Sequence, residues 1–415
     1  MCIRDRRYTD FIIFTFIILS FIYFEHMNKI NFLDSVDWSF PVPISYGPNR
    51  INELPDICKT NNLGRPLLVT DKSSKDLPFM KKILKDLNRS SIKSDIFTDI
   101  SPNPVDDEIY KGRSFYKEGK HDSIIAIGGG SGMDGGKAIS LIANNSENLW
   151  DFEYEKSPIK KLSSFPPLIC IPTTAGTGAE TESTAMVTNS ELGMKLCIWH
   201  PKQKPITALL DPCLTVSLPK NLTAWTGTDA LVHGIEAFCV DSLYSVADGM
   251  ALQGLNLIGN NLLEVYKNPD NLNARGAMLI GSCLTGISFL KGLGLVHAIS
   301  HMVGAVYDTQ HGLTNAIILP QVLNYNKNEI LSKINSMNFS IFNEPGNFDN
   351  FYSNITQILD TLDIPDNLDK IGVNDNKITE LAIKSSKDSA AFTNPKKASI
   401  EDLEKIIKKT IKKAR

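Results

Sequence analysis

The chain has 415 residues, of which 42% are hydrophobic and 21% are charged, and its formal net charge at pH 7 is −3. This length predicts two or three domains, and 43 Lys and Arg against 46 Asp and Glu argue against a surface built mainly to bind nucleic acid. The seven cysteines are scattered without a C-x-x-C pair, which excludes a disulfide framework and zinc-finger spacing and favours a soluble, cytoplasmic protein.

Residues 1–26 differ from the rest of the chain. An apolar run at 11–24 follows a basic stretch that contains Arg4, Arg6 and Arg7. A membrane-spanning helix needs about 20 apolar residues, and no small-residue cleavage site follows, as a signal peptide would require. We expect residues 1–26 to be a dispensable or non-native extension, with Met27 as a natural start. A signal peptide is the alternative, and we expect no membrane anchor.

From Met27 to about Pro212, short apolar strands alternate with helices. The pattern predicts strands at 66–71, 94–100, 122–130, 167–174 and 206–212, and helices at 74–88, 106–118 and 130–143. Strands separated by helices are typical of βαβ units and a parallel sheet. We therefore expect an α/β domain over residues 27–213.

After Pro212 the apolar residues recur at helical spacing, without a convincing strand. This pattern predicts helices at 223–240, 245–266, 272–289, 295–307 and 312–326, and the last residues of the chain are helical as well. We expect an all-helical domain over residues 214–415, with a cleft between the two domains that is available to a ligand.

A glycine-rich turn at 128–137 follows a strand and opens a helix. Its backbone amides could approach phosphate oxygens closely, and it contains the G-x-G-x-x-G pattern of dinucleotide-binding proteins. That pattern normally lies at the first turn of the fold, with an acidic residue downstream, whereas here Asp71 lies upstream of it. Phosphate binding and simple close packing are therefore equally good interpretations of the turn alone, and the Ser/Thr/Gly loop at 172–183 is a weak signal.

Four of the seven histidines lie in one helical region. Asp229 and His233 are four residues apart and project from one helix face, and His297 and His301 repeat that spacing. His311 follows in a glycine-bounded turn. The first pair alone favours a structural role and a ligand role equally, but the additional imidazoles on apolar helices favour a metal such as Fe²⁺ or Zn²⁺.

The ordered set of motifs resembles the iron-containing (group III, metal-dependent) alcohol dehydrogenase family. The resemblance runs from about Ser45 to the final helices. It rests on LLVTD at 67–71, SPNP at 101–104, GGGSGMD at 128–134, PTTAGTGAE at 172–180, DP at 211–212, TDALVHGIE at 228–236, GLVHAISH at 294–301 and HG at 311–312.

The resemblance implies a Rossmann-like N-terminal domain, a helical C-terminal domain and a dehydroquinate synthase-like two-domain architecture. It implies a metal site formed by Asp229, His233, His297 and His311. His301 corresponds to the family histidine near the nicotinamide. The residues that the resemblance assigns to the dinucleotide are Asp71, Asn103, Gly129, Gly130, Ser131, Asp134, Thr173, Thr174, Thr177 and Lys195.

The expected activity is hydride transfer between a small primary or secondary alcohol and a nicotinamide cofactor, with the metal polarising the substrate oxygen. An acid at the end of the 66–71 strand favours NAD(H) over NADP(H), and the family implies a homodimer or larger oligomer. The alternatives are a sugar-phosphate cyclase of the dehydroquinate synthase type, a metal-dependent hydrolase and a non-catalytic metal-binding protein. The apolar stretch at 285–296 lacks the basic cluster that the cyclase substrate needs.

Overall fold

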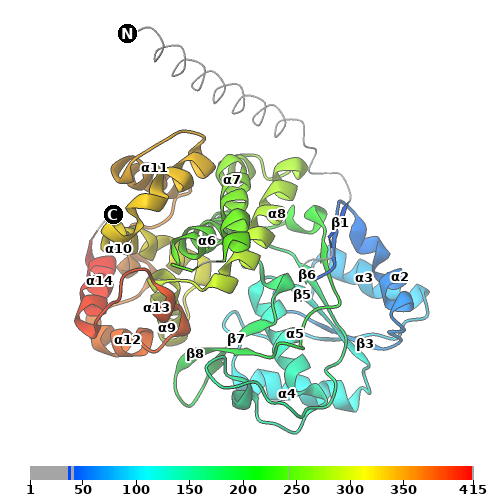
Figure 1. Cartoon of the computed structure of the whole chain (residues 1–415). Coiled ribbons are helices and arrows are strands. Elements are labelled where there is room, and N and C mark those ends of the chain that lie inside the picture. Colours follow the sequence, from blue (N-terminus) through cyan, green and yellow to red (C-terminus); the bar gives the residue numbers. More distant parts are fainter. Residues whose placement is uncertain (1–35, 39–41, 243, 414–415) are drawn as a thin grey trace, which may run out of the picture.

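A seven-stranded sheet forms the centre of the N-terminal half of the computed structural model, which describes residues 36–38, 42–242 and 244–413 (Figure 1). The strand order is β1-β2-β9-β6-β5-β3-β4, and every neighbouring pair is parallel except β1 with β2. The strands are β1 (Val36–Trp38), β2 (Ile44–Tyr46), β3 (Pro66–Val69), β4 (Asp95–Phe97), β5 (Ser123–Gly128), β6 (Leu168–Pro172) and β9 (Thr207–Leu210).

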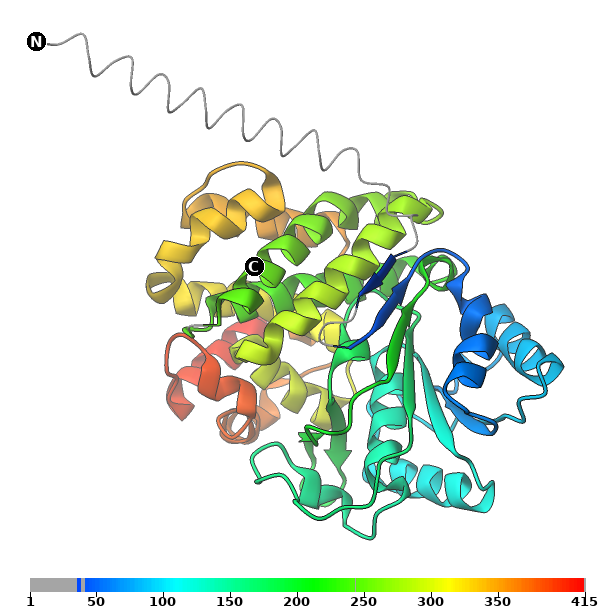
Figure 2. The same cartoon turned by 45° about the vertical axis from the view of Figure 1, so that its right-hand side comes forward.

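Helices cover both faces of this sheet, because successive residues of its central strands are buried on opposite sides. Leu67 and Ile124 belong to a core shared with α4 (Asp106–Glu118) and α5 (Gly130–Ala143). Leu68 and Ile125 belong to a second core, shared with α2 (Leu54–Thr60) and α3 (Pro78–Arg89). Figure 2 shows the sheet between these two layers, as expected for a doubly wound α/β fold.

A two-stranded antiparallel hairpin lies outside the main sheet and was not predicted. It consists of β7 (Thr184–Asn189) and β8 (Met194–Trp199). Strand β7 packs against α5 of the α/β half, whereas β8 packs against α9 of the helical half. The hairpin therefore joins the two halves of the molecule.

The remainder of the described chain is helical (Figure 1). One large core joins most of these helices, and a smaller one packs β2 and β9 against α7 and α8. The helices are α6 (Lys220–Cys239), α7 (Ser245–Lys267), α8 (Leu272–Ser288), α9 (Leu295–Tyr307), α10 (His311–Phe342), α11 (Phe348–Thr361), α12 (Ile378–Ser385), α13 (Ser389–Thr393) and α14 (Ile400–Lys412); the short 3₁₀ turns are η1 (Arg50–Glu53), η2 (Leu149–Phe152), η3 (Ala179–Thr181), η4 (Pro212–Thr215), η5 (Phe289–Lys291), η6 (Leu368–Ile371) and η7 (Asp375–Lys377).

The predicted fold class is confirmed, and so are the five predicted strands, with shorter bounds. Two helix boundaries were wrong. The helix predicted from residue 74 begins at Pro78, because the backbone turns after Asp71 instead of entering the helix. The helix predicted to end at residue 326 continues to Phe342. The extension predicted at residues 1–26 lies outside the described residues.

No single helix within residues 36–38, 42–242 and 244–413 is long and apolar enough to cross a membrane. The segments 272–291 and 295–307 reach that length and composition only together, and they meet at a bend of 102°.

Candidate metal and cofactor site

The glycine-rich turn lies at the point in the parallel sheet where the order of the strands reverses direction. Strand β5 pairs with β3 on one side and with β6 on the other, and β4 continues beyond β3. Loops that follow neighbouring strands leave in opposite directions at such a point and open a crevice at the carboxyl ends of the strands. The turn after β5 and the loop after β3 flank this crevice, which explains why the turn does not lie at the first βα connection.

The glycine-rich turn packs against the loop at 172–183, most closely at Gly130. A Cβ on Gly130 would lie 2.6 Å from Cγ2 of Thr177, and one on Gly129 would lie 3.4 Å from Cγ2 of Thr174. Gly129 is the N-cap of α5, so the free amides of the first helical turn face this loop. Ser131 donates a hydrogen bond to the backbone oxygen of Pro102 over 2.6 Å.

The Asp71 carboxylate lies next to this turn. A Cβ on Gly128 would approach its Oδ2 within 3.4 Å. The backbone amides of Ser73 and Ser74 and the Ser74 hydroxyl donate to Asp71 over 2.7–3.0 Å, which fixes the carboxylate at the end of β3. Thr173 follows β6, and its amide donates to the oxygen of Gly128 over 2.9 Å.

Asn103 and Lys195 extend the same region toward the helical half. The Asn103 amide donates to Oδ1 of Asp308 over 2.7 Å and accepts from Nζ of Lys195 over 3.4 Å. Burial lowers the pKa of Lys195, although Asp134 and Asp229 act in the opposite direction. Burial raises the pKa of Asp134 to about 6.

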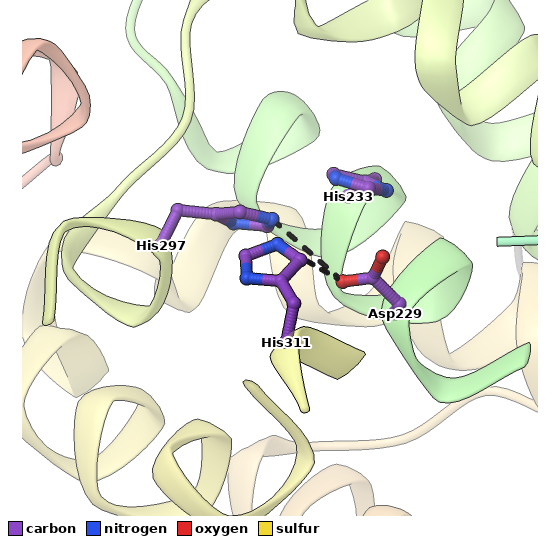
Figure 3. Close-up of side chains that lie close together, drawn as sticks. All are labelled: Asp229, His233, His297 and His311. Carbon is purple, nitrogen blue, oxygen red and sulfur yellow. Dashed lines mark ion pairs between the residues drawn. The ribbon is translucent and has the colours of Figure 1, made fainter. Parts of the chain in front are cut away.

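Four side chains from three helices converge at the boundary between the halves (Figure 3). Asp229 and His233 come from α6, His297 from α9, and His311 is the first residue of α10 rather than part of a turn. One potential ligand atom from each lies within 4.8 Å of the others. The dashed lines join Oδ1 of Asp229 to Nε2 of His297 at 3.9 Å and to Nε2 of His311 at 3.7 Å.

Burial keeps two of these imidazoles neutral. It lowers the pKa of His233 to about 4 and lowers the pKa of His311 well below its usual value. A neutral imidazole has one ring nitrogen with a free lone pair, which is the form that binds a metal. One carboxylate with three imidazoles fits a divalent first-row ion and leaves a coordination position for a further ligand.

Hydrogen-bond contacts at Nδ1 fix the orientation of two of the imidazoles. Nδ1 of His297 is 2.6 Å from Oε2 of Glu236, and Nδ1 of His233 is 3.3 Å from the oxygen of Gly176. In each ring, Nε2 is thereby left for the centre of the cluster, as is usual for metal-bound histidines. Glycine at position 312 lets α10 approach α6, since a Cβ there would lie 2.4 Å from the oxygen of Trp225.

Asn315 supplies the strongest sign that a cation fits at the centre. Its Nδ2 lies 2.7 Å from Oδ1 of Asp229 and 3.1 Å from Nε2 of both His297 and His311. An amide nitrogen has only two hydrogens, yet three acceptors point at it. Asp229, His297 and His311 therefore present more accepting capacity than the amide can satisfy, and a cation among them would use it.

His301 lies beside this cluster and is not one of its four members. Its ring stacks on that of His311 with 5.4 Å between centroids, and its Nδ1 is 2.8 Å from Oδ2 of Asp388. Sequence analysis missed Glu236, Asn315 and Asp388 as site residues. Glu236 and Asp388 contact residues 61 and 87 positions away, whereas Asn315 lies four residues after His311 on α10.

The predicted site residues therefore gather in two neighbouring groups. The dinucleotide candidates lie around the carboxyl ends of β3, β5 and β6, with Lys195 arriving from β8, and the four ligand candidates lie among α6, α9 and α10. Asn103 spans the gap between the groups through Asp308, the residue that follows α9.

Comparison with known proteins gives matches over nearly the whole described chain. Residues 41–212 match the family "Iron-containing alcohol dehydrogenase", and residues 223–411 match "Fe-containing alcohol dehydrogenase family, C-terminal".

Curated relatives agree with this match. The chain is 32% identical to an NAD-dependent methanol dehydrogenase of Bacillus methanolicus, covering 88% of this chain and 97% of that protein. It is also 32% identical to a 1,3-propanediol dehydrogenase of Klebsiella pneumoniae, covering 90% and 98%. Among solved structures, an alcohol dehydrogenase from Oenococcus oeni superposes with a TM-score of 0.83 at 30% identity, covering 91% and 99%.

Proposed function

This chain belongs to the iron-containing alcohol dehydrogenase family, and we propose that it is an NAD-dependent enzyme that interconverts a small primary or secondary alcohol and its aldehyde or ketone. The observation that carries the proposal is the juxtaposition of two sites. A cluster of one carboxylate and three imidazoles lies near the glycine-rich turn, because Ser131 of the turn bonds to Pro102 and the adjacent Asn103 bonds to Asp308 at the end of α9.

We propose Asp229, His233, His297 and His311 as the ligands of one divalent ion, Fe²⁺ in the first place and Zn²⁺ or another such ion as alternatives. A bound ion would polarise the substrate oxygen, while a nicotinamide would accept or supply the hydride. The chain's own contribution is to hold the ligands in place. Glu236 fixes the orientation of His297, and Asn315 that of Asp229, through the contacts described above.

For the dinucleotide, we propose that the amides at Gly129, Gly130 and Ser131 bind the pyrophosphate at the N-terminus of α5. Asp71 would accept hydrogen bonds from the adenosine ribose and repel a 2′-phosphate, which favours NAD(H) over NADP(H). The other proposed contacts are Asn103, Asp134, Thr173, Thr174, Thr177 and Lys195. The naming of the Bacillus methanolicus relative as NAD-dependent supports this preference.

His301 is proposed as the catalytic residue that moves or holds the alcohol proton. A fifth protein ligand would occupy the position that the substrate oxygen needs. Its Nδ1 is engaged by Asp388, and Nε2 has no hydrogen-bond partner among the residues that the structure describes. Nε2 is therefore the nitrogen available to the substrate.

The sugar-phosphate cyclase is not favoured, because the curated relatives reported above are alcohol dehydrogenases. The names of those relatives, which contain methanol and 1,3-propanediol, suggest short unbranched alcohols as the first class to test. The limits of the two family matches also support a division into domains at 27–213 and 214–415. Assembly as a homodimer or larger oligomer and a cytoplasmic location remain predictions.

The deciding experiment uses protein loaded with Fe²⁺ or Zn²⁺ and a panel of C1 to C4 alcohols and aldehydes, with the absorbance of the reduced nicotinamide as readout. We expect turnover with NAD(H) that is lost on chelation and restored by metal. Turnover that is unaffected by metal removal would contradict the proposed role of the cluster, and turnover only with NADP(H) would contradict the role of Asp71.

A further inference from the structure

The segment that follows α12 reaches the site from the far end of the chain. Asp388 lies 87 residues after His301, and both side chains are almost fully buried, with 4% and 8% of their surfaces exposed. Oδ2 of Asp388 is 2.8 Å from Nδ1 of His301, and its Oδ1 accepts from the amide of Ala390 over 2.9 Å. Each carboxylate oxygen therefore has its own partner.

The same segment is fastened to the start of α9, the helix that carries His297 and His301. The Thr393 hydroxyl accepts from the amide of Leu293 over 3.1 Å and donates to the oxygen of Leu293 over 2.7 Å. Oδ1 of Asn394 accepts from the amide of Leu295 over 3.2 Å. Position 292 has φ +113 and lies against Thr393, so only glycine suits this close contact.

Asn394 is held in turn by α10. Its side-chain amide and that of Asn326 exchange two hydrogen bonds of 2.9 and 2.8 Å. The segment 388–394 is thus fixed at 393–394, and at its other end the amide of Asp388 donates to the oxygen of Ser385 over 3.2 Å. A buried carboxylate held this rigidly acts on the ring as a fixed acceptor.

A fixed acceptor at Nδ1 determines which ring nitrogen of a neutral imidazole carries the proton. The carboxylate has no hydrogen to give, so the bond requires that Nδ1 carries the proton. Nε2 then presents its lone pair on the side of the ring away from Asp388.

We propose that Asp388 is a positioning residue that holds His301 in the Nδ1–H form with Nε2 directed at the substrate oxygen. This inference rests on the proposed alcohol dehydrogenase function, and it deepens that function by including the segment 388–394 in the site. His301 is the group that touches the substrate, and Asp388 acts only through it.

The test compares Asp388→Asn, Asp388→Ala, His301→Ala and the double variant Asp388→Asn/His301→Ala. Asparagine caps a helix as well as aspartate, so Asp388→Asn keeps the bond to Ala390 and changes only the acceptor that faces His301. The control is Asp349→Asn, which makes the same chemical change in a side chain that is 82% exposed on α11. Kinetics, metal content and NADH binding are measured for each.

We expect Asp388→Asn to lower kcat 10- to 100-fold, while KM, metal content and NADH affinity change less than threefold. In the double variant, Asp388→Asn should cause no more than a twofold further loss beyond that of His301→Ala. If the two losses multiply, or if Asp388→Asn matches wild type, the proposal is overturned.

A spectroscopic measurement tests the positioning role of Asp388 independently of the proposed alcohol dehydrogenase activity. In ¹⁵N-histidine-labelled, Zn²⁺-loaded protein, the protonated Nδ1 signal of His301 is identified by its loss in His301→Ala. We expect this signal to shift in Asp388→Asn, to vanish in Asp388→Ala and to persist in Asp349→Asn. An unchanged signal in Asp388→Ala would refute the positioning role. If the signal behaves as expected while wild type oxidises no alcohol, the assigned activity fails and the positioning stands.

Discussion

Replacing Glu236 by Gln gives a direct test of how the metal cluster is held. This carboxylate is 6% exposed and has two short contacts, from Oε1 to the amide of Val296 at 2.8 Å and from Oε2 to Nδ1 of His297 at 2.6 Å. Both partners are donors. Glutamine has only one accepting atom in place of two, so its NH₂ group would face one of these donors.

The magnitude follows from that mismatch. A hydrogen bond to a charged group contributes about 1.5–3 kcal/mol to stability, and at least one such bond is lost in Glu236→Gln. We therefore expect a decrease of about 1.5–3 kcal/mol in the free energy of unfolding of the metal-free protein. Because His297 loses its fixed orientation, metal affinity should also fall roughly 10- to 100-fold.

Metal affinity is measured by competition with a chelator of known affinity, and stability by thermal unfolding with and without metal. Glu329→Gln, an exposed change on α10, is the matched control. If Glu236→Gln is destabilised but binds metal as tightly as wild type, Glu236 supports only the helices. If neither quantity changes, the reasoning about the buried carboxylate is wrong.

Four further predictions concern the remaining parts of the site. Removing one ligand by His311→Ala should reduce metal content from about one ion per chain to below a tenth of that value by elemental analysis, and retained metal would contradict the ligand set. Gly130→Val should weaken NADH binding at least tenfold in a fluorescence titration without changing metal content, since its Cβ would lie 2.6 Å from Thr177. Asp71→Gly should narrow the ratio of kcat/KM for NAD⁺ over NADP⁺ at least tenfold, and an unchanged ratio would place the choice elsewhere. Burial in the folded state raises the pKa of Asp134 from 3.8 to about 6, so ionisation of this carboxyl lowers the stability of the fold as the pH rises through that interval. Asp134→Asn should therefore raise Tm at pH 7 but not at pH 4. An equal change in Tm at both pH values would refute the predicted pH dependence.

Part of the metal cluster and the neighbouring His301 were accessible from sequence because two spacings are local. Asp229 and His233 are four residues apart on one helix, and so are His297 and His301, so helical periodicity alone places each pair on one face. What unites the pairs is packing between helices, which periodicity does not describe. The family resemblance supplied that step.

Two of the site residues that sequence analysis missed contact partners that are distant in the chain. Glu236 contacts a residue 61 positions away and Asp388 one 87 positions away, and neither has a neighbour in sequence that reveals its partner. The hairpin that carries Lys195 was also missed, because strands β7 and β8 mix polar and apolar residues around a turn at 190–193. The end of α10 could have been found: Ile330, Ile334 and Ile341 continue its buried face past the predicted end at 326.

Because the four ligand candidates come from α6, α9 and α10, metal binding should affect the stability of the protein in the cell. Their atoms meet only after helices separated by up to 82 residues have packed, so an unfolded chain offers an ion no comparable site. An ion that binds there selects the folded state by mass action, adding about 4 kcal/mol when its free concentration is roughly a thousandfold above Kd. Metal supply would then set the resistance of this enzyme to heat and to proteolysis as well as its catalytic competence, and metal starvation would lower its abundance.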